Sequence, residues 1–299
     1  VEAKMFVPIE TGDGSSTFYS EAFGEWFHSR EGACNEAQKT YVEASTLATR
    51  AQGNSLKILD VCYGLGYNTA AALETILQVN PSCQVEVQAL EIDIEVARSA
   101  IAANLTQHYS PAVQEMLSAI AHTQKVTRPP INIHLRLGDA RQQIQPLVKQ
   151  GWQADIIFLD PFSPPHCPQL WSTDFLQLVA QCLNPHAGVL VTYSCAAAVR
   201  SALQLAGLSI GSTHAGGRKW PGTIAQHAPT DLPPLSQQET EHLQTRAAVP
   251  YRDPTLQRSA KEILAQRSQE QSASTLLPTK PWRLRWQQQQ QARGADSSV

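Results

Sequence analysis

Short apolar runs alternate with amphipathic stretches over the middle of the chain. Five runs have the character of buried strands: residues 56–61, 85–90, 131–136, 154–159 and 188–193. Helical spacing follows three of them, at residues 68–79, at residues 94–105 and again up to Ala206. Strands that alternate with helices predict an α/β fold with a mostly parallel, doubly wound, Rossmann-like sheet. Right-handed crossovers then bring the C-terminal strand ends to one edge, where such sheets bind ligands.

The pattern divides the chain into three regions. Residues 1–50 contain turn formers, an aromatic stretch and a helical pattern, so we expect an N-terminal extension that acts as a lid and lines part of a substrate pocket. Residues 51–226 hold the β-α units and form the main domain. Within that domain, residues 108–128 fit no simple β-α repeat, and we expect a helical insertion there.

The third region, residues 227–299, is rich in Gln, Ser, Pro and Thr, and we expect a largely disordered tail. Helices are possible near residues 239–246 and 255–269. Residues 279–286 interleave cations with tryptophans, a composition that could hold RNA through phosphate contacts and base stacking. The alternative, which we favour slightly, is a segment that packs back on the domain through its tryptophans.

Composition narrows the class of protein. The chain of 299 residues is 42% hydrophobic, enough for a buried core. No apolar run approaches the ~20 residues of a membrane-spanning helix, and the N-terminus lacks a signal-peptide pattern. The six cysteines form no CxxC pair and no zinc-type spacing, so we expect a cytoplasmic protein with reduced thiols, no metal and no membrane contact. A net charge of −3 leaves a nucleic-acid partner open. The oligomeric state is not indicated.

A glycine-rich turn follows the first strand, at residues 60–68. Gly64 and Gly66 allow a sharp backbone turn, and the next helix presents free N–H groups to a ligand. The dinucleotide pattern GxGxxG would need a third glycine where Thr69 stands, which disfavours NAD. S-adenosylmethionine (SAM) has no pyrophosphate and does not require that glycine.

Three acids end three successive strands. Glu91 can accept hydrogen bonds from ribose hydroxyls, or it can be a solvated residue at a strand end. Asp139 stands where an acid in SAM enzymes typically meets the adenine amine, but it can also cap the next helix, and the two roles are compatible. Asp160 ends the fourth strand, beside the expected SAM methyl group. This order and spacing predicts a class I SAM-dependent methyltransferase.

Residues 158–171 carry the most informative pattern. Asp160 is followed by a proline-stiffened loop that contains Phe162 and ends at Trp171. The two aromatic rings could stack on a flat base, wall the pocket or simply pack in the core. Methyl transfer from a sulfonium needs an oriented lone pair, and a carboxylate such as Asp160 can orient an amine and remove its proton.

Here the sequence resembles the MnmC methyltransferase family, which methylates the aminomethyl group of 5-aminomethyl-2-thiouridine at the tRNA wobble position. The family pattern Asp-Gly-Phe-x-Pro-x-x-Asn-Pro-x-x-Trp is matched at Asp160, Phe162, Pro164, Pro168 and Trp171. Pro161 replaces the usual Gly and Cys167 the usual Asn. Residues 13–20, 28–36, 60–68 and 216–219 also resemble family segments, so that the resemblance covers residues 10–226.

The resemblance implies roles for individual residues. SAM would be bound by Asp60, Tyr63, Gly64, Gly66, Glu91, Asp139 and Ala140. Asp160 would be the catalytic residue that holds the amine, although it could also be a turn or cap residue, and the substrate would contact Phe162 and Trp171. Glu36 would line the substrate pocket, or it could lie on a solvated face of the N-terminal helix. Arg218 and Lys219 would contact tRNA phosphates, although both could be ordinary surface charges.

Many family members carry a second, FAD-dependent domain. The 73 residues after residue 226 are too few for it and hold no dinucleotide pattern, so we expect a stand-alone methyltransferase without FAD. The leading hypothesis is SAM-dependent methylation of 5-aminomethyl-(2-thio)uridine at the tRNA wobble position. The alternatives are a SAM-dependent methyltransferase for another RNA, a protein or a small amine, and a non-catalytic SAM-binding module.

Overall fold

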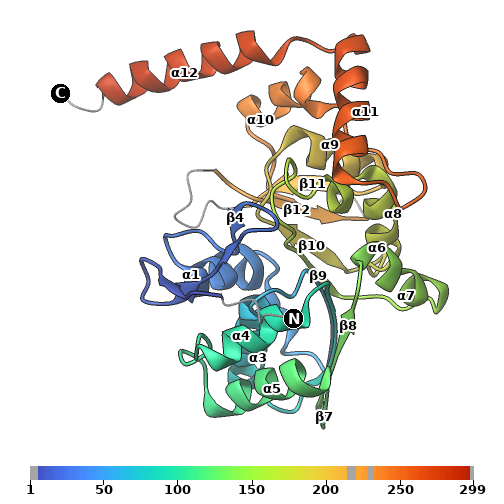
Figure 1. Cartoon of the computed structure of the whole chain (residues 1–299). Coiled ribbons are helices and arrows are strands. Elements are labelled where there is room, and N and C mark those ends of the chain that lie inside the picture. The colour runs from blue at the N-terminus through green and yellow to red at the C-terminus, as the bar shows by residue number, and fades with distance from the viewer. Residues whose placement is uncertain (1–5, 214–219, 228–231, 297–299) are drawn as a thin grey trace.

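One eight-stranded sheet forms the centre of the computed structural model, which describes residues 6–213, 220–227 and 232–296 (Figure 1). Its strand order is β11 (Ser209–Ser212), β12 (Thr223–Gln226), β10 (Val189–Thr192), β9 (Ile156–Leu159), β5 (Ser55–Val61), β6 (Gln84–Glu91), β8 (Ile131–Leu137) and β7 (Lys125–Arg128). The five strands from β10 to β8 run parallel, and β12, β11 and β7 are antiparallel to their neighbours. The predicted mostly parallel α/β fold is confirmed.

The register brings the strand ends to a common level. Val61 at the end of β5 is paired with Leu90 on one side and with Leu159 on the other. On β6, Glu91 is paired with Leu137. The residues that follow these strands therefore share one edge of the sheet, as a parallel arrangement requires.

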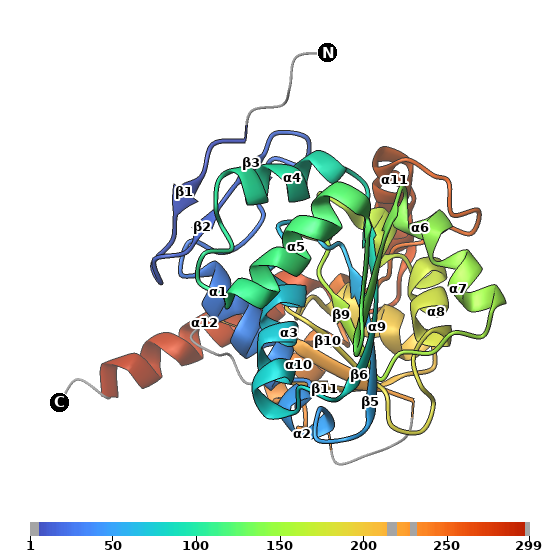
Figure 2. The same ribbon diagram turned by 90° about the horizontal axis from the view of Figure 1, so that it is seen from below.

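Helices cover both faces of the sheet, because alternate strand residues point to opposite sides. In β9, Ile156 and Phe158 belong to one buried core, whereas Ile157 and Leu159 belong to the other. The first core is covered by α3 (Tyr67–Val79), α4 (Ile94–Ala102) and α5 (Pro111–Thr123). The second is covered by α6 (Ala140–Gln143), α7 (Gln145–Lys149), α8 (Thr173–Gln181) and α9 (Ala197–Leu205). Figure 2 shows the two layers on either side of the sheet.

The N-terminal extension joins the first core. It contains two short hairpins, β1 (Ile9–Glu10) with β2 (Ser16–Thr17) and β3 (Tyr19–Ser20) with β4 (Glu25–Trp26). These are followed by α1 (Ala33–Glu36), the π-helix η1 (Ala37–Glu43) and α2 (Leu47–Arg50). Phe18 and Tyr41 are fully buried, and the Tyr41 ring packs edge-on against Phe158 of β9. The extension is thereby fixed to the central sheet.

The insertion at residues 108–128 is helical only in its first part. Helix α5 covers the predicted helix, but the segment ends in the strand β7, which pairs antiparallel with β8. Val126 of β7 is buried in the first core. An amphipathic edge strand of four residues is too short to be separated from a helix by its pattern.

The expectation of a largely disordered tail is wrong. After β12 the structure contains α10 (Gln237–His242), a 3-10 turn η3 (Arg246–Ala248), α11 (Ala260–Ala273) and α12 (Thr279–Asp296). The tail is anchored by few but fully enclosed side chains: Tyr251 and Ile263 belong to the second core, and Asp253 has no exposed surface. Composition averaged over 73 residues does not show such isolated anchors.

The basic-aromatic segment begins α12, which extends from the body of the molecule (Figure 1). The Trp282 ring stacks on His242 with centroids 4.1 Å apart, and Trp286 Nε1 donates to Glu241 at 2.8 Å. The tryptophans thus pack on α10, a helix of the tail itself, and not directly on the domain as the favoured alternative had it. Lys280 and Arg283 remain exposed.

Burial of Ile263 predicts a stability test for the tail. Ile263→Ala should lower the free energy of unfolding by about 2–5 kcal/mol, because it leaves a cavity in a closed core. The neighbouring Leu264→Ala should change it by less than about 0.5 kcal/mol, since that side chain is exposed. Urea unfolding measures both variants. Equal, small effects would mean that the tail does not pack on the domain.

Candidate functional site

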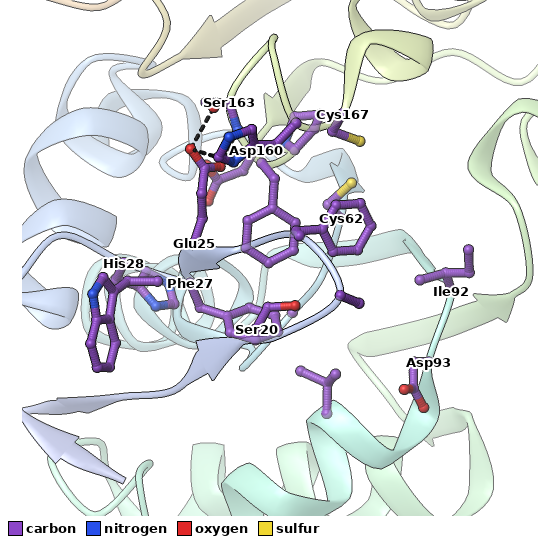
Figure 3. A pocket seen from close by; sticks show the side chains of 18 of the residues that line it. Ser20, Glu25, Phe27, His28, Cys62, Ile92, Asp93, Asp160, Ser163 and Cys167 are labelled. Carbon is purple, nitrogen blue, oxygen red and sulfur yellow. Dashed lines mark hydrogen bonds and ion pairs between the residues drawn. The ribbon is translucent and has the colours of Figure 1, made fainter. Parts of the chain in front are cut away.

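A pocket of about 1260 Å³ opens at the C-terminal edge of the sheet. Its walls come from the strand ends and from residues 6–36 of the N-terminal extension. Eight of the residues singled out from the sequence line it: Glu36, Tyr63, Gly64, Glu91, Asp139, Ala140, Asp160 and Phe162. Figure 3 shows Glu25, Asp160 and Ser163 at one end of the pocket and Ile92 and Asp93 at the other.

The glycine turn after β5 is held by Glu91. Gly64 has φ 55° and Gly66 has φ 87°, a left-handed conformation that favours glycine. One Glu91 oxygen accepts from the Gly64 N–H at 2.8 Å, and the other accepts from the N–H groups of Ile92 and Asp93. Burial raises the pKa of Glu91, although these three donors act against the rise. The Glu91 carboxylate is therefore held by backbone N–H groups at the pocket wall, and Glu91 is not a solvated residue at a strand end.

Asp60 lies beneath this turn and does not line the pocket. Its carboxylate is fully buried and accepts from Thr69 Oγ1 at 2.6 Å, while its other oxygen has no hydrogen-bond partner. Burial raises the pKa of Asp60 to about 7. Gly66 is also absent from the lining. Both residues support the turn from behind.

Asp139 lines the pocket and caps α6. Its carboxylate accepts from the Arg141 N–H at 2.9 Å, so the capping role is confirmed. The carboxylate also pairs with the Arg141 guanidinium at 2.6 Å.

Ile92, which follows β6 directly, lines the pocket with 64% of its surface exposed. An apolar surface flanked by Glu91 and Asp139 fits a ligand with a flat ring and hydroxyl and amine donors, as adenosine has.

Asp160 lies at the opposite end of the pocket, where two donors fix its carboxylate. The Tyr41 hydroxyl donates to Oδ1, and Asn68 Nδ2 donates to Oδ2 at 2.8 Å. Burial raises the pKa of Asp160 well above its usual range, and the nearby charge of Glu36 adds to the rise. Glu36 itself accepts from the Ser29 N–H at 2.9 Å. Two carboxylates therefore stand at this end, and a cation there would stabilise both.

Tyr41 was not singled out from the sequence, and Asn68 was given no role. Tyr41 is separated from Asp160 by 119 residues, and a tyrosine in an amphipathic helical stretch is indistinguishable from a core residue. Asn68 follows the glycine turn directly, so its position at a strand-end helix was a usable signal.

Aromatic rings surround the acidic end of the pocket. Phe162 stacks on Phe23 with centroids 4.5 Å apart and meets Phe27 edge-on at 5.0 Å. Trp171, in contrast, is fully buried and does not line the pocket: its Nε1 donates to the Phe162 carbonyl at 2.8 Å. The structure thus places Trp171 among the supports of the loop and not in contact with a pocket ligand. Arg218 and Lys219 lie outside the described residues.

Glu25 is a further residue that the sequence did not indicate. Its carboxylate accepts from the N–H of Ser163 at 2.8 Å and from its hydroxyl, and it lies 3.2 Å from His166 Nδ1. The contacts join the β3–β4 hairpin to the proline-rich loop after β9. The expected lid is therefore linked directly to the loop that carries Phe162.

Among the described residues, no group of three or more His, Cys, Asp or Glu side chains is arranged to hold a metal ion. None of the helices in this part of the chain combines the length and apolar character that a bilayer crossing needs.

Known proteins resemble the chain at three levels. A family model described as an S-adenosyl-L-methionine-dependent methyltransferase matches residues 102–228. An uncharacterized protein of Methanocaldococcus jannaschii is 31% identical over 270 residues, which cover 88% of this chain and 72% of that protein. The crystal structure of MnmC2 from Aquifex aeolicus has a TM-score of 0.80 and 31% identity, covering 91% of this chain and 87% of that one.

The tRNA 5-methylaminomethyl-2-thiouridine biosynthesis bifunctional protein MnmC of Aromatoleum aromaticum is 29% identical over 211 residues. The match covers 66% of this chain and 31% of the relative. The matched part of the chain therefore corresponds to about a third of that bifunctional protein.

The buried Asp60 predicts a pH effect on stability. Its folded pKa of about 7 exceeds the usual value of 3.8, so between these values the folded state holds a proton that the unfolded state lacks. Stability then falls as pH rises from about 4 to 7, by about 4 kcal/mol at most from this group. Asp60→Asn keeps an acceptor for Thr69 and removes the titration. Unfolding free energies measured from pH 4 to 8 should decline less for this variant than for the wild type. If both proteins lose the same stability over this range, Asp60 does not have the raised pKa.

Proposed function

Because this chain belongs to the family of S-adenosyl-L-methionine-dependent methyltransferases that includes MnmC2, we propose that it methylates the aminomethyl group of 5-aminomethyl-(2-thio)uridine at the wobble position of tRNA. The observation that carries the proposal is the end of the pocket that holds Asp160. This end of the pocket adjoins the glycine turn and combines the fixed carboxylate of Asp160, the second carboxylate of Glu36 and the aromatic rings around Phe162. We expect the reaction to take place in the cytoplasm, where tRNA is modified.

SAM supplies an electrophilic methyl group when it binds. We assign its ribose hydroxyls to Glu91 and its adenine amine to Asp139, on either side of Ile92. Tyr63, Gly64 and Ala140 line the same part of the pocket, whereas Asp60 and Gly66 hold the turn from behind. The residues present fit the cofactor, because carboxylates face its donors and an apolar side chain faces its ring.

The aminomethyl group is a cation at neutral pH and must become a neutral amine before it attacks. Asp160 holds this group and first accepts one proton from the ammonium. The freed lone pair then forms the new C–N bond as the methyl–sulfur bond breaks, which leaves a methylammonium product and the neutral thioether S-adenosylhomocysteine. The raised pKa of Asp160 makes it a stronger proton acceptor than an ordinary carboxylate. Tyr41 and Asn68 hold the carboxylate in place, and Glu36 adds negative charge for the incoming ammonium.

The aromatic rings next to Asp160 suit a flat uracil base, which stacks on Phe162 once Phe23 moves aside. The exposed cations Lys280 and Arg283 of α12 supply charge for the tRNA backbone. We assign the same role to Arg218 and Lys219. Closure of the lid by the contacts of Glu25 would exclude water from the site.

One experiment tests substrate and product together. The protein is incubated with radiolabelled SAM and bulk tRNA from cells blocked in this wobble methylation, and the labelled nucleoside is identified after digestion. Label is expected in 5-methylaminomethyl-uridine, thiolated or not. SAM binding without label in tRNA would reject the proposed substrate and redirect the search to other RNAs, proteins or small amines.

In the same assay, Asp160→Asn should lower turnover by about 10²–10⁴-fold, since the amide cannot accept the proton. The affinity for SAM, measured by calorimetry, should stay within a few-fold. Asp155→Asn is the matched control: Asp155 accepts from the Lys57 N–H at the opposite end of β9. A variant Asp160→Asn with unchanged turnover would remove Asp160 from the mechanism.

Tyr41→Phe tests the proton-accepting role through pH. The hydrogen bond from Tyr41 lowers the pKa of Asp160, so its loss raises that pKa further. Because the base acts only when deprotonated, the acidic limb of the pH–rate profile should move to higher pH. Tyr109→Phe removes a buried hydroxyl that does not touch Asp160 and should leave the limb in place. A limb that stays unmoved in Tyr41→Phe, or moves to lower pH, would count against a catalytic Asp160.

A further inference from the structure

We propose that Asp253 in the C-terminal tail is a positioning residue for the SAM site, acting through Arg141 on Asp139. The proposal rests on the proposed function in one respect, the assignment of the adenine amine to Asp139. It means that residues 251–259, outside the β-α domain, complete the cofactor site.

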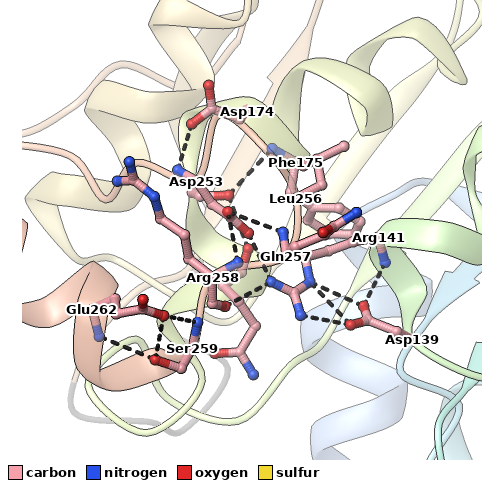
Figure 4. A network of polar contacts seen from close by, with 12 residues as sticks. Asp139, Arg141, Asp174, Phe175, Asp253, Leu256, Gln257, Arg258, Ser259 and Glu262 are labelled. Atoms are coloured by element: carbon pink, nitrogen blue, oxygen red, sulfur yellow. Dashed lines mark hydrogen bonds and ion pairs between the residues drawn. The ribbon is translucent and has the colours of Figure 1, made fainter.

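The three side chains form a continuous chain of contacts (Figure 4). Arg141 Nη2 donates to Asp139 Oδ2 at 2.6 Å, and Arg141 Nε lies 3.1 Å from both oxygens of that carboxylate. On its other side, Arg141 Nη1 donates to Asp253 Oδ2 at 2.7 Å and to the Arg258 carbonyl at 3.0 Å. A planar guanidinium held at both ends has one orientation, and it transmits that orientation to Asp139.

Asp253 is itself fixed by the tail. Its second oxygen accepts from the N–H groups of Gln257 at 3.2 Å and Arg258 at 3.1 Å. Its own N–H donates to Asp174 of α8 at 2.6 Å. Because Asp253 has no exposed surface, its charge depends on Arg141 for compensation. The pair is therefore a rigid connection between the tail and the pocket wall.

The geometry at Asp139 leaves room for one more donor. A carboxylate offers about four acceptor positions. Three donors occupy Asp139: the backbone N–H of Arg141, its Nε and its Nη2. The side chain of Asp139 is 34% exposed and lines the pocket, whereas that of Arg141 is only 12% exposed. The remaining position is available to an amine in the pocket, and its direction is set by how Arg141 holds the carboxylate.

Asp253→Asn separates this role from simple stabilisation of the tail. The amide oxygen still accepts from Gln257 and Arg258, but the uncharged NH2 group then faces Arg141 and cannot accept its hydrogen bond. Two ligands are compared by calorimetry on the full-length protein: S-adenosylhomocysteine and S-inosylhomocysteine, which carries an oxygen in place of the adenine amine. The first should bind Asp253→Asn about tenfold more weakly than it binds the wild type. The second should bind both proteins equally, because the oxygen that replaces the amine has no hydrogen to donate to Asp139 at that position.

Glu262→Gln is the matched control. Glu262 belongs to the same segment and caps α11 through Ser259, but it does not contact Arg141. Its affinity for both ligands should equal that of the wild type. Arg141→Lys provides a second variant that keeps a cation beside Asp253 and loses the planar fork; it should also weaken S-adenosylhomocysteine selectively.

Three results would overturn the proposal: unchanged affinity of Asp253→Asn and Arg141→Lys for S-adenosylhomocysteine, an equal loss for both ligands, or a wild type that does not distinguish the ligands. The second result would make Asp253 a structural residue. The third would show that Asp139 does not bind the adenine amine. Failure of the proposed function is separate, because it shows as S-adenosylhomocysteine binding without methyl transfer to tRNA.

Discussion

The need to satisfy carboxylates at one edge of a parallel sheet is the constraint on which the rest of this structure depends. Asp60 lies one residue before the end of β5, Glu91 ends β6, and Asp139 and Asp160 follow β8 and β9, and these strands finish at the same level. A buried carboxylate is tolerated only where donors or cations face it. Each acid has accordingly its own partners, and these partners determine what surrounds the pocket.

The partners come from different parts of the chain, and this explains why the domain needs its extensions. Asp60 and Glu91 have local partners: Thr69 donates to one oxygen of Asp60, and the backbone N–H of Gly64 donates to Glu91. Asp160 depends on Tyr41 from the N-terminal extension, and Asp139 shares Arg141 with Asp253 from the tail. The β-α units alone would leave the two acids at the ends of the pocket without part of their support.

This division also separates what the sequence predicted from what it did not. The strands, the glycine turn and the acids that follow them are local patterns, and the structure brings Glu91, Asp139 and Asp160 to one pocket as expected. Contacts between residues more than 100 positions apart, such as Tyr41 with Asp160, leave no local pattern. Trp171 was expected in the pocket, but an aromatic side chain can line a pocket or pack in a core, and its sequence position does not separate the two. In the structure Trp171 packs in the core. The tail was misjudged because three enclosed side chains, Tyr251, Asp253 and Ile263, decide its packing and its average composition does not.

The cysteines of the pocket have a consequence for the order of chemical events. Burial raises the pKa of Cys62 well above its usual range and that of Cys167 to about 12, so both remain thiols at neutral pH. A thiol is a poor nucleophile, and neither residue is suited to carry a methyl group or to attack a base covalently. The thiols thus favour direct transfer, in which donor and acceptor occupy the pocket together; initial-rate plots for the two substrates should then intersect, as for a sequential mechanism, and not run parallel as for a ping-pong one.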